Sequence, residues 1–398
     1  MRLTSSKSAF PAACVLTTLI STVVADAISL YSLCQYPTRD PLLGCPKNTI
    51  LVSPTHAKAK FKTIQSAILS TVDNDAAQTI LVLGGTYREQ LNVTRTGPLT
   101  LLGETKNPES IAANKVEVIW AAYENQTIET YGDNAFTSVL TVSPNLAASL
   151  TGSGPTGYPV PEDTPLGTNN FRAYNFKFTN DGEDYSAGPA LALSVSRANS
   201  SFYYCGFYSY QDTIYIGKLG NAYFWKNEVA GQTDFLYGFG TAFFEKTSLL
   251  LRSCGGGITA WKGTNTTYEN KFGVYISNSN IKAANTSVAA SIKGKCALGR
   301  PWNSLHRSVF MNTELDASIR PQGYTTWTSP IIEQTVLGEY KDTGPGFNLT
   351  GREDGNITKL LSDREVQQYR RPQDVFLSST DGKRISLSWI DPLFRTYF

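Results

Sequence analysis

Short segments with alternating apolar and polar positions recur through the middle of the chain. Each has an apolar residue, a small or polar residue or Tyr three positions later, and another apolar residue two positions after that. Alternation of this kind predicts strands with one buried face. The six segments are FRAYNF (171), FYYCGF (202), FWKNEV (224), FEKTSL (244), ISNSNI (276) and FMNTEL (310).

The spacing of these segments indicates a repeating, all-β architecture. Successive segments begin 31, 22, 20, 32 and 34 residues apart. Recurrence every ~20–35 residues is typical of stacked repeats, here coils of constant size with loops of varying length. The pattern favours a parallel β-helix built from single strands of successive coils. A propeller or a sandwich stays open as an alternative, because periodicity alone does not separate these folds.

Helical and irregular segments surround the repeats. Residues 61–72 (FKTIQSAILSTV) have helical spacing and predict a helix that caps the open N-terminal end of the stack. Residues 104–170 are rich in Gly, Pro, Asn and Thr, which predicts long loops around short strands. Near the C-terminus, Ser362 and Glu365 form a capping-box pattern that predicts a short helix.

The start of the chain has the composition of a secretory signal. Two basic residues precede an apolar stretch that ends in small residues, which predicts a signal peptide over residues 1–25. We expect one domain over 26–398, with the core of the stack at about 50–345 and a tail at 346–398 on its outside. No other stretch is apolar for the ~20 residues that a membrane span needs. We therefore expect a secreted, extracellular monomer.

Potential glycosylation sites and the charge balance agree with export. Without Arg2 and Lys7, 33 basic residues face 33 acidic ones, and no basic block favours nucleic acid. Seven Asn-x-Ser/Thr sites predict a glycosylated surface of eukaryotic type: Asn92, Asn125, Asn199, Asn265, Asn285, Asn348 and Asn356.

Five cysteines remain after the predicted signal peptide. Cys34 and Cys45 are close enough in sequence for a local disulfide in an oxidising compartment. Cys205, Cys254 and Cys296 leave an odd count, so at least one is expected to be a buried thiol. Only two histidines and no CxxC motif argue against zinc.

Two acidic residues stand in similar strand-like surroundings. Asp212 lies within YSYQDTIYIG, and Asp234 lies 22 residues later within GQTDFLYG. Either could be an ordinary turn residue. If one coil has about 22 residues, both occupy equivalent positions on neighbouring strands, which stack ~4.8 Å apart. Two carboxyl groups that close do not ionise together easily, so one pKa should rise.

Such a pair places a proton donor beside a nucleophile or base, which suits ester or glycoside chemistry. Arg300, in ALGRPW, is a candidate to hold one carboxylate ionised through a bidentate contact. Trp302 could offer a flat face to a sugar ring. Each has a plainer alternative: a surface ion pair for the arginine and a core position for the tryptophan.

A serine hydrolase fits the sequence poorly. There is no G-x-S-x-G motif, and a Ser–His relay would need His56 or His306. His56 lies in a polar N-terminal segment far from the acidic pair, and His306 is expected to be a loop residue.

The motifs together resemble the pectin methylesterases, the pectinesterases of plants, fungi and bacteria. The resemblance covers residues 50–345, and the sequons and the lack of an inhibitor-like N-terminal domain resemble the fungal type. Seven motifs occur in the family's order: FKTIQSAI, GGTYREQL, SYQDTIYIG, AGQTDFLYG, GGGITA, ALGRPW and GYTTW.

The resemblance implies a right-handed parallel β-helix of the pectin-lyase type and assigns roles to individual residues. Asp234 would attack the methyl ester carbonyl at C6 of galacturonate. Asp212 would protonate the departing methanol and then activate water. Gln211 would donate to the oxyanion, and Arg300 would position Asp234 and keep it charged. The implied substrate-binding residues are Trp302, Tyr215 and Trp327.

The resemblance also sets expectations for partners and rivals. The implied partner is methyl-esterified pectin, with plant inhibitor proteins as further candidates. No metal, organic cofactor, nucleic acid or membrane is expected. A lyase or a polygalacturonase on the same fold would need other machinery, either clustered acids that hold calcium or more acids than this pair.

One position departs from the family pattern. A glutamine is normal about one coil before YQDT, but the position 22 residues before Gln211 is Pro189. Proline has neither a side-chain donor nor a backbone N–H. Losing one oxyanion donor typically costs ~10²–10³ in rate. We expect an active, impaired esterase, and the alternative is a β-helix that binds cell-wall pectin with little or no turnover.

Overall fold

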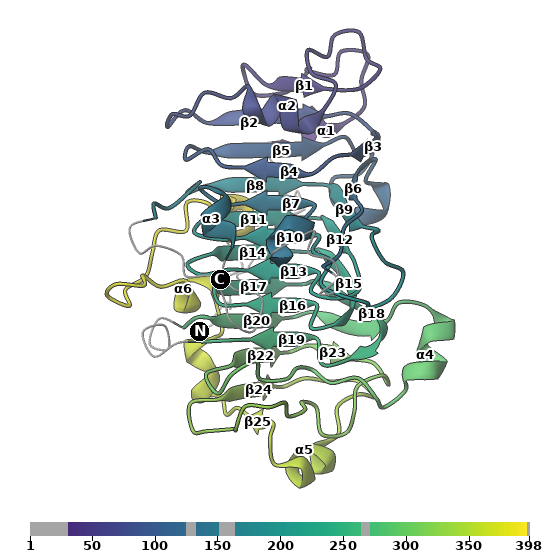
Figure 1. Cartoon of the computed structure of the whole chain (residues 1–398), viewed down its shortest axis with the longest axis vertical. Helices are drawn as coiled ribbons and strands as arrows, with labels where there is room; N and C mark the ends of the chain where they lie inside the picture. Colours follow the sequence, from purple (N-terminus) through teal and green to yellow (C-terminus); the bar gives the residue numbers. More distant parts are fainter. Residues whose placement is uncertain (1–30, 125–132, 151–163, 264–270, 396–398) are drawn as a thin grey trace, which may run out of the picture.

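Figure 1 shows a computed structural model, which describes residues 31–124, 133–150, 164–263 and 271–395. Successive turns of the chain stack in sequence order from β1 to β25, and the named strands pair in parallel. They form three sheets that run the length of the stack. The fold is therefore the predicted parallel β-helix, and the propeller and sandwich alternatives are wrong.

The three sheets differ in length. The eleven-stranded sheet contains β1 (Ile50–Val52), β2 (Gln78–Val82), β5 (Leu99–Gly103), β8 (Phe171–Tyr174), β11 (Asn199–Tyr203), β14 (Asn221–Trp225), β17 (Thr241–Glu245), β20 (Gly273–Ser277), β22 (Arg307–Met311), β24 (Val336–Tyr340) and β25 (Lys359–Leu360). The eight-stranded sheet contains β3 (Gly85–Arg88), β6 (Val116–Trp120), β9 (Phe176–Asn180), β12 (Gly206–Tyr208), β15 (Glu228–Thr233), β18 (Ser248–Gly255), β21 (Asn280–Ala283) and β23 (Glu314–Leu315). The six-stranded sheet contains β4 (Leu91–Val93), β7 (Leu140–Val142), β10 (Leu193–Val195), β13 (Ile214–Ile216), β16 (Leu236–Gly238) and β19 (Thr259–Trp261).

The strand register explains the repeats in the sequence. Phe202 pairs with Phe224, and Phe224 pairs with Phe244, at the predicted intervals of 22 and 20 residues. Their buried rings stack inside the coil, with centroids 5.0 and 4.1 Å apart. The predicted alignment of the first two segments was wrong by two residues. It matched Phe171 with Phe202, whereas Phe171 pairs with Ser200. Equivalent interior positions thus carry the hydrophobic pattern.

A repeated backbone corner follows the strands of the eleven-stranded sheet, and at six of its seven occurrences the next strand belongs to the eight-stranded sheet. The first residue after each of seven strands is left-handed, with φ between 48° and 60°. L-residues adopt this region rarely, and Asn and Asp do so more readily than others. Stacking puts one such corner above the next, at Asn175, Tyr204, Lys226, Lys246, Asn278, Asn312 and Lys341.

Helices are short and lie at the ends and sides of the stack. The predicted N-terminal helix is α2 (Ile64–Leu69), which begins after the N-cap Thr63 and packs against β1, β2 and β4. The predicted capping box is present, and the helix it begins is a 3₁₀ turn, η3 (Glu365–Gln368). The other helices are α1 (Ser32–Gln35), η1 (Ile111–Ala113), η2 (Asn134–Thr137), α3 (Leu146–Ser149), α4 (Thr286–Ile292), α5 (Leu349–Gly355), α6 (Pro372–Val375) and α7 (Pro392–Arg395).

The C-terminal segment packs on the outer face of the eleven-stranded sheet, as predicted, and returns alongside the stack in Figure 1. Phe394 stacks on Tyr203, with ring centroids 4.7 Å apart. Tyr174 donates a hydrogen bond to Asp391, and Ser201 donates one to the Trp389 carbonyl. The tail therefore covers apolar surface that this sheet would otherwise expose to water.

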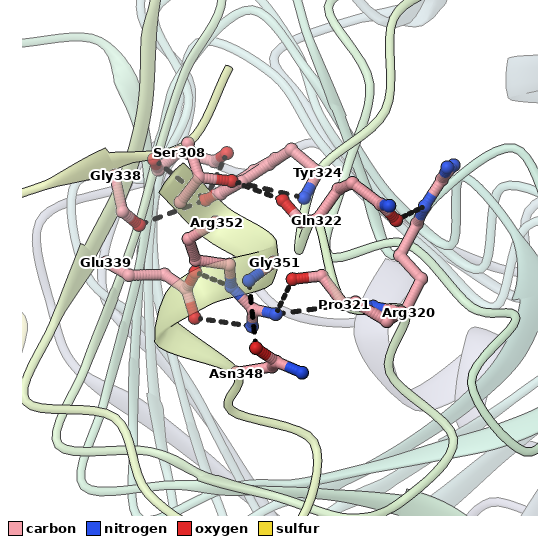
Figure 2. Close-up of polar contacts among 11 residues, drawn as sticks. Ser308, Arg320, Pro321, Gln322, Tyr324, Gly338, Glu339, Asn348, Gly351 and Arg352 are labelled. Atoms are coloured by element: carbon pink, nitrogen blue, oxygen red, sulfur yellow. Dashed lines mark hydrogen bonds and ion pairs between the residues drawn. The ribbon is translucent and has the colours of Figure 1, made fainter. Parts of the chain in front are cut away.

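A buried ion pair fixes α5 at the C-terminal end of the stack (Figure 2). Arg352 Nε and Nη2 donate to the two carboxylate oxygens of Glu339 at 2.6 and 3.0 Å, and both side chains are fully buried. Nη1 donates to the carbonyls of Arg320 and Pro321. The guanidinium thus joins α5, β24 and the loop before Tyr324 in one network.

Breaking this ion pair should destabilise the fold strongly. Replacing Arg352 by Met leaves the Glu339 carboxylate buried without its partner, a change that costs ~3–5 kcal/mol in comparable pairs. Urea unfolding should show the loss, and the double substitution Arg352→Met/Glu339→Leu should recover most of it. As a control, Arg371→Met at a half-exposed ion pair should cost less than ~1 kcal/mol. Equal effects at the two arginines would contradict the assignment.

The cysteines behave as the sequence indicated. Cys34 and Cys45 form the predicted local disulfide, and the odd thiol, Cys205, is buried. Cys254 and Cys296 form a second disulfide, which the sequence did not specify. None of the helices in the described ranges has the length and apolar character required to cross a bilayer. The predicted signal peptide and the sequons at Asn125 and Asn265 lie outside the described residues.

Candidate active site

The two aspartates lie side by side at one corner of the stack. Ile214 of β13 pairs with Leu236 of β16, so Asp212 and Asp234 hold equivalent positions just before these strands. Both have left-handed backbones, with φ of 60° and 47°. The same corner on the next coil is Gly256, with φ of 62°. Left-handed corners recur throughout this fold, and at this one they place two carboxyl groups on neighbouring coils.

Arg300 holds Asp234 in a bidentate contact. Its Nε lies 3.0 Å from Oδ1, and its Nη2 lies 2.7 Å from Oδ2. The Gly257 amide also donates to Oδ1 at 3.2 Å. On its other side the guanidinium stacks on Trp327, 3.6 Å from the ring centroid. Gly256 must lack a side chain, because a Cβ there would lie 2.6 Å from Arg300 Nε and from Asp234 Oδ1.

Burial and Arg300 act differently on the pKa values of the two carboxyl groups. Burial, followed by the charge of Asp234, raises the pKa of Asp212 well above its usual range. Burial also raises the pKa of Asp234, but the hydrogen bonds and charge of Arg300 oppose that rise. The surroundings thus favour the protonated form of Asp212, while Arg300 favours the charged form of Asp234, which is the division that a donor beside a nucleophile requires.

Because of this raised pKa, Asp212→Asn should stabilise the protein at neutral pH. The folded state binds the Asp212 proton more tightly than the unfolded chain, whose Asp pKa is ~3.9. Wild-type Asp212 therefore makes its full contribution to the free energy of unfolding only below its pKa in the unfolded chain. That contribution falls by ~1.4 kcal/mol for each pH unit between this pKa and the higher pKa of the folded state, and it is lost once the pH exceeds the folded-state pKa. Urea unfolding at about pH 3 and about pH 7.5 should show variant and wild type equal in acid and the variant more stable at neutral pH. A pH-independent difference would refute this.

Gln211 is oriented with its amide nitrogen free. The Ser186 hydroxyl donates to Gln211 Oε1 at 2.8 Å and lies 2.9 Å from Thr233 Oγ1. Among the described residues, no acceptor pairs with Gln211 Nε2. A fixed carbonyl end and an unpaired N–H₂ end beside the acidic pair suit a side chain that donates to a developing oxyanion.

Pro189 lies next to Gln211, at the position expected from the sequence. The Ala190 amide donates to the Gln211 carbonyl, as the Asp212 amide does to Thr233 on the next coil. In this part of the coil the offset between neighbouring strands is therefore 22 residues. From Leu193 onward the offset is 21 residues, since Leu193 pairs with Ile214. The change occurs where the amides of Ala192 and Leu193 both donate to the Thr213 carbonyl. The partly exposed proline supplies no donor to the site.

The three aromatic residues assigned to substrate differ in exposure. Trp327 is 40% exposed, and Trp302 is partly exposed, packing on Tyr237 and Phe239 with centroid distances of 5.9 and 5.1 Å. Tyr215 is only 1% exposed and packs beside Tyr237 at 4.7 Å. A buried ring offers no face to a sugar, and Tyr215 instead packs against Tyr237 and Phe239.

Several side chains at the site gave no recognisable signal in the sequence. Asn134, in the segment predicted to be loops, has its Nδ2 3.4 Å from both Asp212 Oδ2 and the Tyr237 hydroxyl. Glu124 bonds through its amide to the Pro189 carbonyl, and its charge further raises the pKa of Asp212. These residues and Ser186 are distant in sequence from every motif, so only the fold brings them to the acidic pair.

The second histidine is structural. His306 is fully buried just before β22, its Nε2 lies 2.7 Å from Ser308 Oγ, and burial lowers its pKa to about 3. Ser308 is equally buried, so this Ser–His pair is closed to a substrate. Within the described ranges, no three His, Cys, Asp or Glu side chains gather in a way that could hold a metal ion.

Comparison with known proteins places this site in a family. The family model described as Pectinesterase matches residues 165–378, which include both aspartates and Arg300. This match covers more than half of the chain. The chain belongs to the pectinesterase family. It is accordingly a carboxylic ester hydrolase by family, and the resemblance noted in the sequence is confirmed.

Individual pectinesterases agree with the family match. A probable pectinesterase A of Aspergillus niger is 29% identical over 294 residues, which cover 74% of this chain and 78% of the relative. The crystal structure of the A. niger pectin methylesterase has a TM-score of 0.62 at 24% identity, covering 80% and 90% of the two chains. A pectin methylesterase in complex with a hexasaccharide has a TM-score of 0.64 at 23% identity, covering 83% and 97%. The two solved structures support the fold.

Proposed function

We propose that this pectinesterase removes methyl esters from the galacturonate units of pectin and releases methanol through an aspartyl acyl-enzyme. The observation that carries the proposal is the bidentate contact between Arg300 and Asp234, one strand away from the buried Asp212. It yields an ionised carboxylate beside a protonated one without histidine or metal. Neither lyase nor polygalacturonase chemistry is needed to account for this arrangement.

In the first half of the reaction, an Asp234 carboxylate oxygen attacks the C6 carbonyl carbon of the ester. The carbonyl oxygen becomes an oxyanion, to which Gln211 Nε2 donates. As the C–OCH₃ bond breaks, Asp212 gives its proton to the departing methoxy oxygen, and methanol leaves. An anhydride between Asp234 and galacturonate remains, while Asp212 is now ionised.

In the second half, Asp212 takes a proton from water, and the resulting hydroxide attacks the acyl carbon. The bond to Asp234 breaks, which releases the galacturonate carboxyl group and returns both aspartates to their starting states. Arg300 stabilises Asp234 as the nucleophile and again as the leaving carboxylate. Trp327, which is exposed and stacks on Arg300, and the partly exposed Trp302 are the proposed contacts for neighbouring sugar rings.

Export and glycosylation belong to the same proposal. Two disulfides within the described residues support folding in an oxidising compartment. Asn92 and Asn285 are exposed at the surface and are accessible to a glycan. Binding of plant inhibitor proteins, the monomeric state and the division into a signal peptide and one domain stay predictions.

The test is methanol release from highly methylated pectin by the purified wild-type protein, with chain scission followed by viscosity. Ester loss with constant viscosity supports the esterase, whereas a fall in viscosity would indicate a lyase or polygalacturonase. The second candidate, a pectin-binding β-helix with little turnover, rests on Pro189. It predicts that pectin binds but that no methanol appears above background.

A further inference from the structure

A disulfide joins the two chain segments that bind the Asp234 carboxylate. Cys254 lies three residues before Gly257, whose amide donates to Asp234 Oδ1 at 3.2 Å. Cys296 lies four residues before Arg300, whose guanidinium contacts both oxygens of the same carboxylate. The Cys254–Cys296 bond therefore connects the amide donor and the guanidinium donor of one acid through a short covalent path.

The segment after Cys254 is flexible by composition. Three glycines follow this cysteine in the sequence. Two of them are required by close contacts, because a Cβ at Gly256 would lie 2.6 Å from Arg300 Nε, and one at Gly257 would lie 2.6 Å from Gly299 Cα. Glycine loses more conformational freedom on folding than any other residue. The close approach of the two segments therefore depends on a run of chain that neighbouring residues must restrain.

The segment that carries Arg300 rejoins the stack at the other cysteine. After β21 the chain passes through α4, which lies at the side of the stack in Figure 1, and returns at Cys296. Residues 296–300 then contact their neighbours through isolated bridges, of Cys296 with Ile319 and of Gly299 with Thr259, rather than through a named strand. The disulfide is thus a covalent attachment at the point where this segment re-enters the stack.

The contacts to Asp234 are sensitive to a small displacement of either segment. Arg300 Nε and Nη2 lie 3.0 and 2.7 Å from the two carboxylate oxygens. The Asp234 amide in turn donates to the Gly257 carbonyl at 2.7 Å. Hydrogen bonds weaken steeply once distance and angle leave a narrow range, so a shift of about 1 Å would disrupt the bidentate geometry.

We propose that the Cys254–Cys296 disulfide is a positioning element for catalysis, which holds the glycine run and the Arg300 segment where both donors stabilise the charged form of Asp234. The inference rests on the proposed function, in which Asp234 attacks as a carboxylate. Without the disulfide, Asp234 loses part of its contact with Arg300, while burial continues to oppose its ionisation. Its pKa then rises, and less of the protein holds the ionised nucleophile in acid solution.

The test compares wild type with Cys254→Ala/Cys296→Ala and with Cys34→Ala/Cys45→Ala, which removes the disulfide near the N-terminus. Because Asp234 must be ionised to attack, the acid limb of kcat/KM against pH reports its pKa. Loss of the Cys254–Cys296 bond should move that limb about one pH unit higher, so that kcat/KM falls about tenfold on the acid side and less on the plateau. The control should leave the limb in place.

A second measurement reports the Asp234 pKa without turnover. Carbon NMR of protein labelled at its aspartate carboxyl groups follows each acid through a pH titration, and Asp234→Asn identifies the signal by its absence. The ionisable side chains beside Asp234 are Arg300 and Asp212, and the cysteine variant keeps both. Its Asp234 pKa should lie above that of wild type. Arg300→Gln, which removes the guanidinium, should raise the pKa at least as far.

Reduction of the folded protein provides the same comparison if Cys254→Ala/Cys296→Ala does not fold. Dithiothreitol added to Cys34→Ala/Cys45→Ala reduces the remaining disulfide to two thiols and is itself oxidised to a cyclic disulfide. An unchanged acid limb and an unchanged Asp234 pKa would overturn the proposal, even if activity fell uniformly, and would leave the bond a role in stability alone. A wild type that releases no methanol but shows a disulfide-dependent Asp234 pKa would reject the esterase activity and retain the positioning of Arg300.

Discussion

Asp234→Ala should lower methanol release from methylated pectin by at least ~10⁴-fold, as loss of the nucleophile does in other covalent hydrolases. Asp234 is the only carboxylate that Arg300 holds by two hydrogen bonds among the described residues. Asp212 is a poor replacement, because burial, the largest cause of its raised pKa, remains in the variant and favours the protonated form. The loss should appear in kcat, measured by methanol release at saturating pectin.

A folded but inactive protein is the informative outcome, so a matched control is needed. Asp374→Ala removes another largely buried carboxylate that accepts hydrogen bonds from two arginines, far from the site. It should retain wild-type turnover. Asp234→Asn should be as inactive as Asp234→Ala while preserving volume. Residual activity within ~10²-fold of wild type in both Asp234 variants would reject the acyl-enzyme mechanism.

Pro189→Gln should raise kcat by ~10²-fold, with a small effect on KM. One oxyanion donor contributes ~10²–10³ in rate because the oxyanion exists only after attack has begun. Pro189 already lies beside Gln211, and the Ala190 amide keeps its bond to the Gln211 carbonyl. A glutamine at this position adds its side-chain amide to an otherwise complete site. Burst and steady-state methanol release would measure the gain.

Pro189→Met is the matched control, because it restores a backbone N–H and an unbranched side chain without an amide donor. A gain in Pro189→Gln alone would show that the missing donor limits the wild type. Equal activity of all three proteins would mean that another group already serves the oxyanion, and Asn134 is the first residue to test. A silent wild type that becomes active with glutamine would establish the pectin-binding alternative.

The sequence predicted the stacking well because burial repeats on every coil. Alternating residues such as Phe202 and Phe224 face the interior, and that constraint is visible without a structure. The register of the first repeat was misjudged because a four-residue strand can be shifted by two positions and still bury alternate side chains. Pattern alone therefore indicates a coil but does not fix every pairing.

The site was predictable only where its residues lie in short motifs. The 22-residue spacing of Asp212 and Asp234 equals one coil, so it converts directly into proximity. Asn134 and Ser186 reach the same corner from other coils through long loops, and no sequence spacing encodes that. Tyr215 shows the opposite limit: it occurs within a motif and lies outside the interior core that holds Ile214 and Ile216, but packing beside Leu191 and Tyr237 leaves it only 1% exposed.

The left-handed corners at Asp212 and Asp234 also bear on how such a protein changes over evolutionary time. Asparagine accepts this backbone conformation as readily as aspartate, and a single nucleotide converts one codon into the other. Either change would leave the stack and the rings of Trp302 and Trp327 intact. A single mutation can therefore abolish catalysis without loss of the fold. A carbohydrate-binding protein without esterase activity is then only one substitution away from the enzyme.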